Sequence, residues 1–177
     1  MKKATAPSAP FVAADERMAH LVRYGAREFT RALQSRLGAH GVTFGQWIYL
    51  RILWQEDALS QRELSVRANL TEPTTHAAME RLEALGHVTR RNLNGNKRRR
   101  HVFLTQSGAA MRELLEPLAI EVNDAALKGF DPAEIASLRS MMFRVLENLA
   151  RDEAQGFEQG RRIPSTRAQS NPGAVTS

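Results

Sequence analysis

Apolar side chains recur along the first third of the chain at the three- and four-residue steps of one helix face. From Ala14 to about Ala39 this face consists of Met18, Leu21, Val22, Gly25, Phe29, Leu33 and Leu37. Gly38 to Gly41 break the pattern, and Thr43 is a suitable N-cap for a second, strongly apolar run from Phe44 to the residue before Asp57. The pattern predicts two helices joined by a short break.

The middle of the chain changes its hydrophobic period twice. Two short helical runs, Gln61 to Ala68 and Glu72 to Leu85, are separated by a tight break. Two strand-like pieces follow, His87 to Leu93 and His101 to Thr105, and the Asn94-Gly95 pair between them favours a type I′ hairpin turn. Helix, turn, helix and hairpin in this order predict a winged helix-turn-helix, in which the second helix enters the major groove of DNA.

The second of these helices has a polar side that packing leaves free. Thr71 is a good N-cap, Pro73 suits the first turn and Gly86 ends the run. Its apolar side consists of Ala78, Met79, Leu82 and Leu85. We expect DNA contacts from its polar side, from the start of the preceding helix and from the hairpin tip: Ser60, Gln61, Thr71, Pro73, Thr74, Thr75, His76, Ala77, Glu80, Lys97, Arg98, Arg99 and Arg100. Ordinary solvated helix positions are the alternative, and Glu80 either pairs with a neighbouring cation or accepts from a cytosine amine.

Positive charge is concentrated at the hairpin. The chain has a formal net charge of +6, and the window from Ala84 to Arg112 holds seven Lys and Arg residues and no acid. A solvated surface is the ordinary explanation of such a run. Its position directly after a groove-reading helix favours phosphate binding by counterion release, with an arginine of the tip in a narrow minor groove. A non-specific, basic architectural protein that binds DNA or RNA is the alternative function.

The last third of the chain predicts two more long helices. One begins at Thr105 to Gly108, contains Pro117, where we expect a kink, and stops near Gly129. Asp131 and Glu134 then mark the start of a final helix, whose apolar residues step by 3, 4, 3 and 4. We expect a dimer interface formed by Met18, Leu21, Leu118, Val122, Ile135, Leu138, Met142, Val145 and Leu149. An intramolecular seam is the alternative.

Together these elements predict a mainly α chain with a small β-hairpin wing. Residues 14–42 and 105–153 form a helical dimerisation region, and residues 43–104 form a winged helix-turn-helix domain. Residues 1–13 are expected to be a flexible arm and residues 154–177 a disordered basic tail. Neither a long apolar run nor a signal-like N-terminus is present, so we expect no membrane partner and a place in the bacterial cytoplasm, on the nucleoid when DNA is bound.

Catalytic and metal-binding patterns are missing from the sequence. There is no cysteine, which removes disulfides, zinc–cysteine sites and a thiol redox switch. The five histidines are scattered, without metal-binding spacing, and there is no glycine-rich phosphate loop. We therefore expect neither an enzyme nor a cofactor or metal.

The segment from Asn96 to Thr105, read as N-x-R-x-x-x-V-x-L-T, resembles the wing pattern D-x-R-x-x-x-(V/L)-x-L-T of the MarR family of bacterial regulators. Ser60-Gln61-x-x-Leu64, Leu70 and Arg81-Leu82-Glu83-x-Leu85-Gly86-x-Val88 match the family too. The resemblance implies an obligate homodimer on a near-palindromic operator, usually a repressor released by a small ligand. In the family the wing aspartate commonly braces an arginine through a salt bridge, whereas Asn96 can only hydrogen-bond.

The resemblance also implies an effector, often an aromatic or phenolic acid, between the dimer bundle and the winged domain. Candidates for this pocket are Arg23, Tyr24 and Arg27 of the first helix with Trp47 and Trp54 of the second. Burial in the core is the alternative for the two tryptophans. The sequence thus predicts a sequence-specific, DNA-binding transcriptional regulator.

Overall fold

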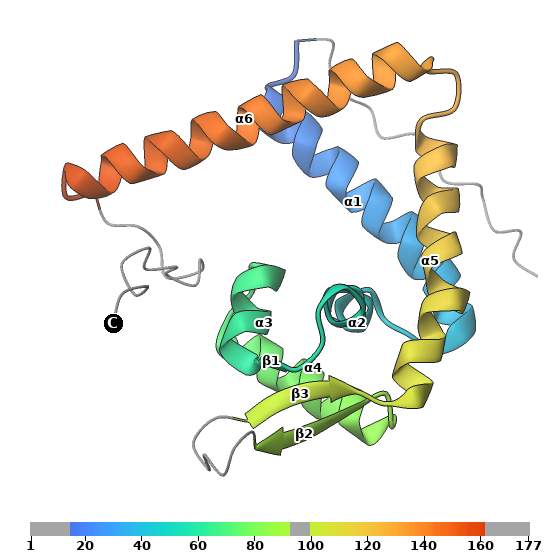
Figure 1. The fold of residues 1–177 in the computed structure, drawn as a ribbon. Coiled ribbons are helices and arrows are strands. Elements are labelled where there is room, and N and C mark those ends of the chain that lie inside the picture. The colour runs from blue at the N-terminus through green and yellow to red at the C-terminus, as the bar shows by residue number, and fades with distance from the viewer. Residues whose placement is uncertain (1–14, 93–99, 162–177) are drawn as a thin grey trace, which may run out of the picture.

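A computed structural model describes residues 15–92 and 100–161 of the chain. The element order is α1 (Met18–Leu37), η1 (Gly38–His40), α2 (Phe44–Gln55), β1 (Leu59–Ser60), α3 (Gln61–Ala68), α4 (Glu72–Ala84), β2 (Val88–Asn92), β3 (Arg100–Leu104), α5 (Gln106–Ala126) and α6 (Pro132–Glu158). Helices α3 and α4 and the sheet lie at one end, helices α1, α5 and α6 at the other, and α2 lies between them (Figure 1). The prediction of a mainly α, winged helix-turn-helix fold is confirmed.

Local capping signals fix most helix ends where the sequence predicts them. Thr43, Ser60 and Asp131 each cap a helix in a reciprocal pair with the residue three positions on, which satisfies amides that a helix start leaves open. At the end of α4, Gly86 adopts a φ of 75°, and the His87 amide donates to the Leu82 carbonyl at 2.9 Å.

Two ends in the C-terminal part differ from the prediction. Helix α5 stops at Ala126 instead of near Gly129. Helix α6 continues to Glu158, so the boundary that placed residues 154–158 in a disordered tail is wrong. The left-handed Gly160 ends α6, and the Arg161 amide donates to the Gly156 carbonyl at 2.8 Å. Residues 162–177, like the expected arm at residues 1–13, lie outside the described residues.

The sheet has three antiparallel strands in the order β1-β3-β2. Val102 at the centre of β3 pairs with Leu59 of β1 and with Arg90 of β2. The sequence predicted the β2–β3 hairpin but not β1, which consists of only two residues. The hairpin tip, with its Asn94-Gly95 turn and the Asn96 of the wing pattern, lies outside the described residues.

One continuous core joins the two ends of the molecule. It contains Leu33 and Leu37 of α1, five residues of or beside α2, Leu64, Met79 and Leu82 of the helix pair, the inner strand residues, and Leu115 and Val122 of α5. Val122 is only 4% exposed and Leu118 packs against this core, because α1 already covers that side of α5 within one protomer. Val122 therefore has almost no surface left for a partner, and assigning it to the dimer interface was wrong, whereas the place of the partly buried Leu118 in that interface stays a prediction. Leu85, expected on the packed side of α4, is 50% exposed.

Candidate nucleic-acid interface

Helix α4 presents a smooth side made of small and polar residues. Pro73, Thr74, His76, Ala77 and Glu80 are all exposed, and Thr71 caps the helix by accepting from the Thr74 amide. Beneath them, Met79 and Leu82 are fully buried. This division is what a helix needs to sit in a groove while packed on its own domain.

Thr75 does not belong to that exposed side. Its side chain is fully buried, and its hydroxyl lies 2.9 Å from the Tyr49 hydroxyl of α2 and donates to the Thr71 carbonyl at 3.0 Å. The expectation that Thr75 contacts DNA is wrong. One position along a helix turns a side chain by about 100°, so Thr74 faces outward and Thr75 faces the core.

The turn between α3 and α4 brings their polar ends together. Asn69 takes the left-handed conformation, with a φ of 53°, and ends α3 so that α4 can pack across it. Gln61, the first residue of α3, then lies beside α4, with its side-chain nitrogen 3.0 Å from Nδ1 of His76. Nε2 of His76 lies 3.2 Å from the Glu80 carboxylate, one helical turn away on the same side of α4. Ser60 is engaged in capping α3.

The wing is fixed to α4 by a short ion pair. Arg90 of β2 approaches the Glu83 carboxylate at 2.6 Å, and the Arg90 amide donates to the same carboxylate at 3.1 Å. The hydrogen bond from Arg90 holds the pKa of Glu83 below its usual value, although partial burial opposes this. The Arg90 side chain is only 10% exposed. The guanidinium of Arg91 stacks over the Phe103 ring, 4.2 Å from its centroid.

The charge run of the sequence is therefore divided between two uses. Arg90 and Arg112 are paired with acids, Glu83 and Glu116, within the protomer. Arg100, at the start of β3, is exposed. The three cations of the hairpin tip, Lys97, Arg98 and Arg99, lie outside the described residues.

A further cation lies on the flank of α4 and was not predicted from the sequence. Arg81 is exposed there, one position beyond Glu80. Its place in a helical projection, at the edge of the predicted polar side, was the signal that would have found it.

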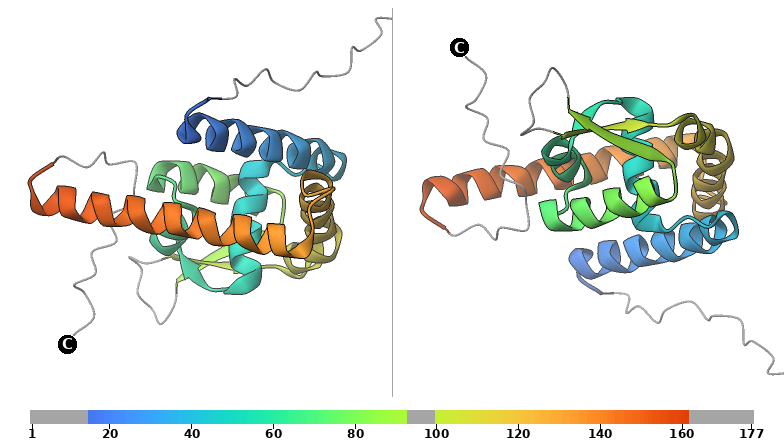
Figure 2. Two further views of the ribbon diagram at one scale, coloured as in Figure 1. Left: turned by 90° about the horizontal axis from the view of Figure 1, so that it is seen from above. Right: turned by 90° about the horizontal axis from the view of Figure 1, so that it is seen from below.

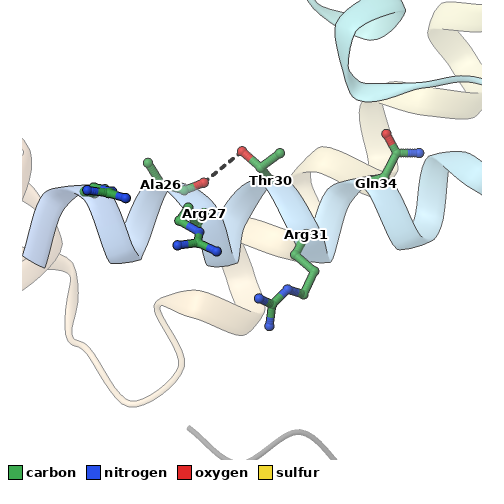
Figure 3. A pocket seen from close by; sticks show the side chains of 6 residues that line it. Ala26, Arg27, Thr30, Arg31 and Gln34 are labelled. Carbon is green, nitrogen blue, oxygen red and sulfur yellow. Dashed lines mark hydrogen bonds between the residues drawn. The ribbon is translucent and has the colours of Figure 1, made fainter. Parts of the chain in front are cut away.

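The expected effector residues separate into two groups. A groove of about 510 Å³ follows one side of α1 and is lined by Arg23, Ala26, Arg27, Thr30, Arg31 and Gln34 (Figure 3). A smaller hollow beside it is lined by His20, Arg23, Tyr24 and Arg27. Trp47 and Trp54 line neither; both pack against the core, and Trp54 donates to the Gly108 carbonyl at 2.9 Å. The two hollows therefore contain the arginines and Tyr24 of the expected pocket but not the tryptophans, which are partly buried against the core.

The described part of the chain offers neither a metal site nor a membrane span. Within residues 15–92 and 100–161, no three His, Asp or Glu side chains gather in a way that would hold a metal ion. In the same ranges, none of the helices combines the length and the apolar character that crossing a bilayer requires.

Known proteins that resemble this chain are transcription regulators. A profile of the MarR family matches residues 40–100. The HTH-type transcriptional regulator TtmR of Methylorubrum extorquens is 30% identical over 156 residues, which cover 87% of this chain and 75% of TtmR.

Solved structures of the family share the fold. A MarR family regulator of Listeria monocytogenes, solved in complex with a 26mer DNA, superposes with a TM-score of 0.72 at 24% identity, covering 84% of this chain and 99% of that one. BpsR of Bordetella bronchiseptica, solved to explain regulation of its DNA binding by 6-hydroxynicotinic acid, gives a TM-score of 0.67 at 22% identity over 78% of this chain and 99% of that one. The matched helix-turn-helix, the wing and the helices on either side of them place this chain in the MarR family of DNA-binding transcriptional regulators.

Proposed function

We propose that the protein is a homodimeric, sequence-specific repressor of a near-palindromic operator, released by a small anionic aromatic ligand. The single observation that carries this proposal is the exposed side of α4, small and polar over a fully buried apolar side, with the wing fixed beside it by Arg90 and Glu83. In a dimer, the two α4 helices would enter successive major grooves on one side of the duplex, roughly 34 Å apart.

The proposed DNA contacts combine exposed residues of the α4 segment with two partly buried residues at the start of α3. Thr71, Pro73, Thr74, His76, Ala77 and Glu80 of the α4 segment, with Ser60 and Gln61 at the start of α3, would meet the major groove. Arg100, together with Lys97, Arg98 and Arg99 of the hairpin tip, would contact flanking phosphates or the minor groove. Sequence would be read from α4, while the wing would set affinity and register.

The dimer would form through the end of the molecule opposite the wing. The C-terminal half of α6 projects beyond the other helices (Figure 2). Large apolar side chains along it are exposed, among them Leu138 at 42% and Leu149 at 61%, and Met18 and Leu21 of α1 are exposed too. An exposed apolar surface of this length on a helix is typical of an interface, and a second copy of the chain offers the same surface by two-fold symmetry. Ile135, Met142 and Val145 belong to the same side of α6 and would join this interface.

The effector would bind along α1. Arg23 and Arg27 of the groove carry positive charge toward the space that α1 borders, and Tyr24 lies in the adjoining hollow, which suits a carboxylate attached to a ring. A ligand of this kind, 6-hydroxynicotinic acid, regulates the DNA binding of BpsR. Binding at this groove would favour a spacing of the two winged domains that no longer fits the operator. Titrating 6-hydroxynicotinic acid and salicylate into the operator complex tests this, with Arg23→Ala and Arg27→Ala as the matched variants.

The decisive experiment is selection of preferred duplexes from a random DNA pool by the purified chain, with its mass measured in the same buffer. We expect a dimer and an enriched inverted repeat whose half-sites are about ten base pairs apart. Tight binding without an enriched repeat, fading uniformly with salt, would instead support the alternative, a basic architectural protein that binds DNA or RNA non-specifically.

A further inference from the structure

Three side chains on the exposed side of the helix pair form a directed hydrogen-bond chain. His76 lies between Gln61 and Glu80, with one ring nitrogen 3.0 Å from the Gln61 amide nitrogen and the other 3.2 Å from the Glu80 carboxylate. A carboxylate only accepts, so Nε2 of His76 carries the proton toward Glu80. Nδ1 then has a free lone pair and accepts from the Gln61 amide.

The direction of these hydrogen bonds determines which donors and acceptors of the three side chains remain available to DNA. Gln61 has committed one N–H group to His76, so its second N–H group and its carbonyl oxygen remain. Glu80 has accepted one hydrogen bond and keeps further lone pairs on a side chain that is 56% exposed. His76 itself has no ring nitrogen left to offer. The cluster therefore presents the Glu80 carboxylate and the Gln61 carbonyl to the groove as acceptors, beside one remaining N–H group of Gln61.

The neighbours of Glu80 do not change this character. Pro73, Ala77 and Ala84 share its side of α4 at helical spacing and carry no side-chain donor. Because these side chains are small, the helix backbone can approach base edges closely. Arg81, the exposed cation of α4, lies one helical step away, on the flank.

Only two bases offer a hydrogen-bond donor to an acceptor in the major groove. Cytosine presents its N4 amino group and adenine its N6 amino group, whereas guanine O6 and N7 and thymine O4 are acceptors themselves. We infer that Glu80, oriented by His76, reads a cytosine amino group in each half-site, and that the Gln61 carbonyl reads the amino group of a neighbouring cytosine or adenine. This inference rests on the proposed function, because it assigns the bases that α4 reads.

The same geometry gives the selectivity a physical basis. A carboxylate in a groove lined by phosphates is repelled by them, so a base without an amino group leaves the remaining lone pairs of Glu80 buried without a donor. Discrimination against the wrong base would then be roughly tenfold or more at the Glu80 position. His76 acts through the other two side chains and is a positioning residue.

The test compares duplexes selected from one random pool by the wild-type chain and by Glu80→Ala, Glu80→Gln and His76→Ala. We expect wild type to fix a cytosine at one position of each half-site. Glu80→Ala should lose the preference at that position alone, and Glu80→Gln should shift it toward adenine, which a carboxamide matches through N6 and N7. His76→Ala should broaden that position and its neighbour together, because both acceptors lose their orientation.

Glu113→Gln, which removes an exposed acid of α5, is the matched control and should select the wild-type repeat. Circular dichroism and mass confirm that each variant is folded and dimeric. The inference is wrong if wild type and Glu80→Gln enrich the same base at every position. It is also wrong if a crystal structure of the selected complex shows guanine or thymine facing Glu80. An absence of any repeat with wild type would instead overturn the proposed function.

Discussion

The hydroxyl groups of Tyr49 and Thr75 lie 2.9 Å apart in the interior and join α2 to α4. Thr75 donates onward to the Thr71 carbonyl, so Tyr49 donates to Thr75, and the chain runs from α2 to the residue that caps α4. Burial raises the pKa of the Tyr49 phenol, an effect that the Thr75 hydrogen bond partly opposes, so the phenol stays a neutral donor. Through this contact α2 fixes the end of α4 that would meet DNA.

The two partners of this hydrogen bond should not be equivalent to mutation. Tyr49→Phe removes one hydrogen bond while Thr75 still bonds Thr71, at a cost of about 1 kcal/mol of unfolding free energy. Thr75→Val leaves the buried Tyr49 hydroxyl without an acceptor and should cost more, about 1–3 kcal/mol. Urea unfolding at one fixed protein concentration measures both, and the double variant should cost less than the two single costs added. If the two single variants cost equal unfolding free energies that add in the double variant, the proposed chain of hydrogen bonds from Tyr49 through Thr75 to Thr71 is wrong.

The Glu83–Arg90 pair should make stability depend on pH in the acid range. The folded-state pKa of Glu83 is lowered, so its contribution is present above the unfolded pKa, about 4.3, and is lost as pH falls through the folded value. Because the Glu83 side chain is 37% exposed, the contribution is discounted to less than about 1 kcal/mol. Unfolding free energies of wild type and Glu83→Gln between pH 7 and pH 3 should therefore converge toward the acid end. If the difference in unfolding free energy between the two proteins stays constant with pH, the Glu83–Arg90 ion pair makes no pH-dependent contribution to stability.

Gly108 is a site where a single methyl group should disrupt the junction of wing and α5. A Cβ there would lie 2.0 Å from the His87 carbonyl oxygen and 3.2 Å from the Leu104 side chain. Gly108→Ala should therefore destabilise the fold by about 1–3 kcal/mol, as overpacking does. Gly45→Ala is the matched control, because its Cβ meets nothing closer than 4.0 Å and α2 gains helix propensity. If the thermal unfolding midpoint of Gly108→Ala is equal to or higher than that of Gly45→Ala, the close contact between Gly108 and His87 is wrong.

Charge placed on the apolar side of α6 should separate the protomers. The paired change Leu138→Glu and Leu149→Glu puts carboxylates on exposed apolar positions, and we expect the mass in light scattering to fall from dimer to monomer. Operator affinity should fall with it, since one protomer reaches one half-site. Ser140→Glu adds the same charge on the polar side and should leave a dimer. A double variant that remains dimeric would place the interface elsewhere.

Arg100 should contribute affinity without sequence preference. It is exposed at the base of the wing, and Arg100→Ala should weaken binding to selected and scrambled duplexes by similar factors while reducing the salt slope by about one. Arg98→Ala, at the tip, should cost about 1–3 kcal/mol of operator binding if it reads a base edge, and less at a phosphate. Arg112→Ala serves as the control, because Arg112 is paired with Glu116 in α5. Fluorescence anisotropy over a salt series measures all three.

Features of this protein that depend on residues close together in the chain could be predicted from the amino-acid sequence. The caps at Thr43, Thr71 and Asp131 and the glycine end at Gly86 were readable, because they involve residues three to five positions apart. The helix-turn-helix and its wing followed from these local signals in order, and with them the family.

Tertiary structure alone decided which side chains remain free to act. Thr74 and Thr75 are the same residue type at adjacent positions, yet only packing against Tyr49, 26 residues away in the chain, removes Thr75 from the surface. Arg90 pairs with Glu83 and so leaves the charge run, and burial in the core removes Val122 from the predicted dimer interface. Helical periodicity gives the side of a helix to within about one residue. The residues that pack on that side come from distant parts of the chain, so they are known only from the packing of the folded core.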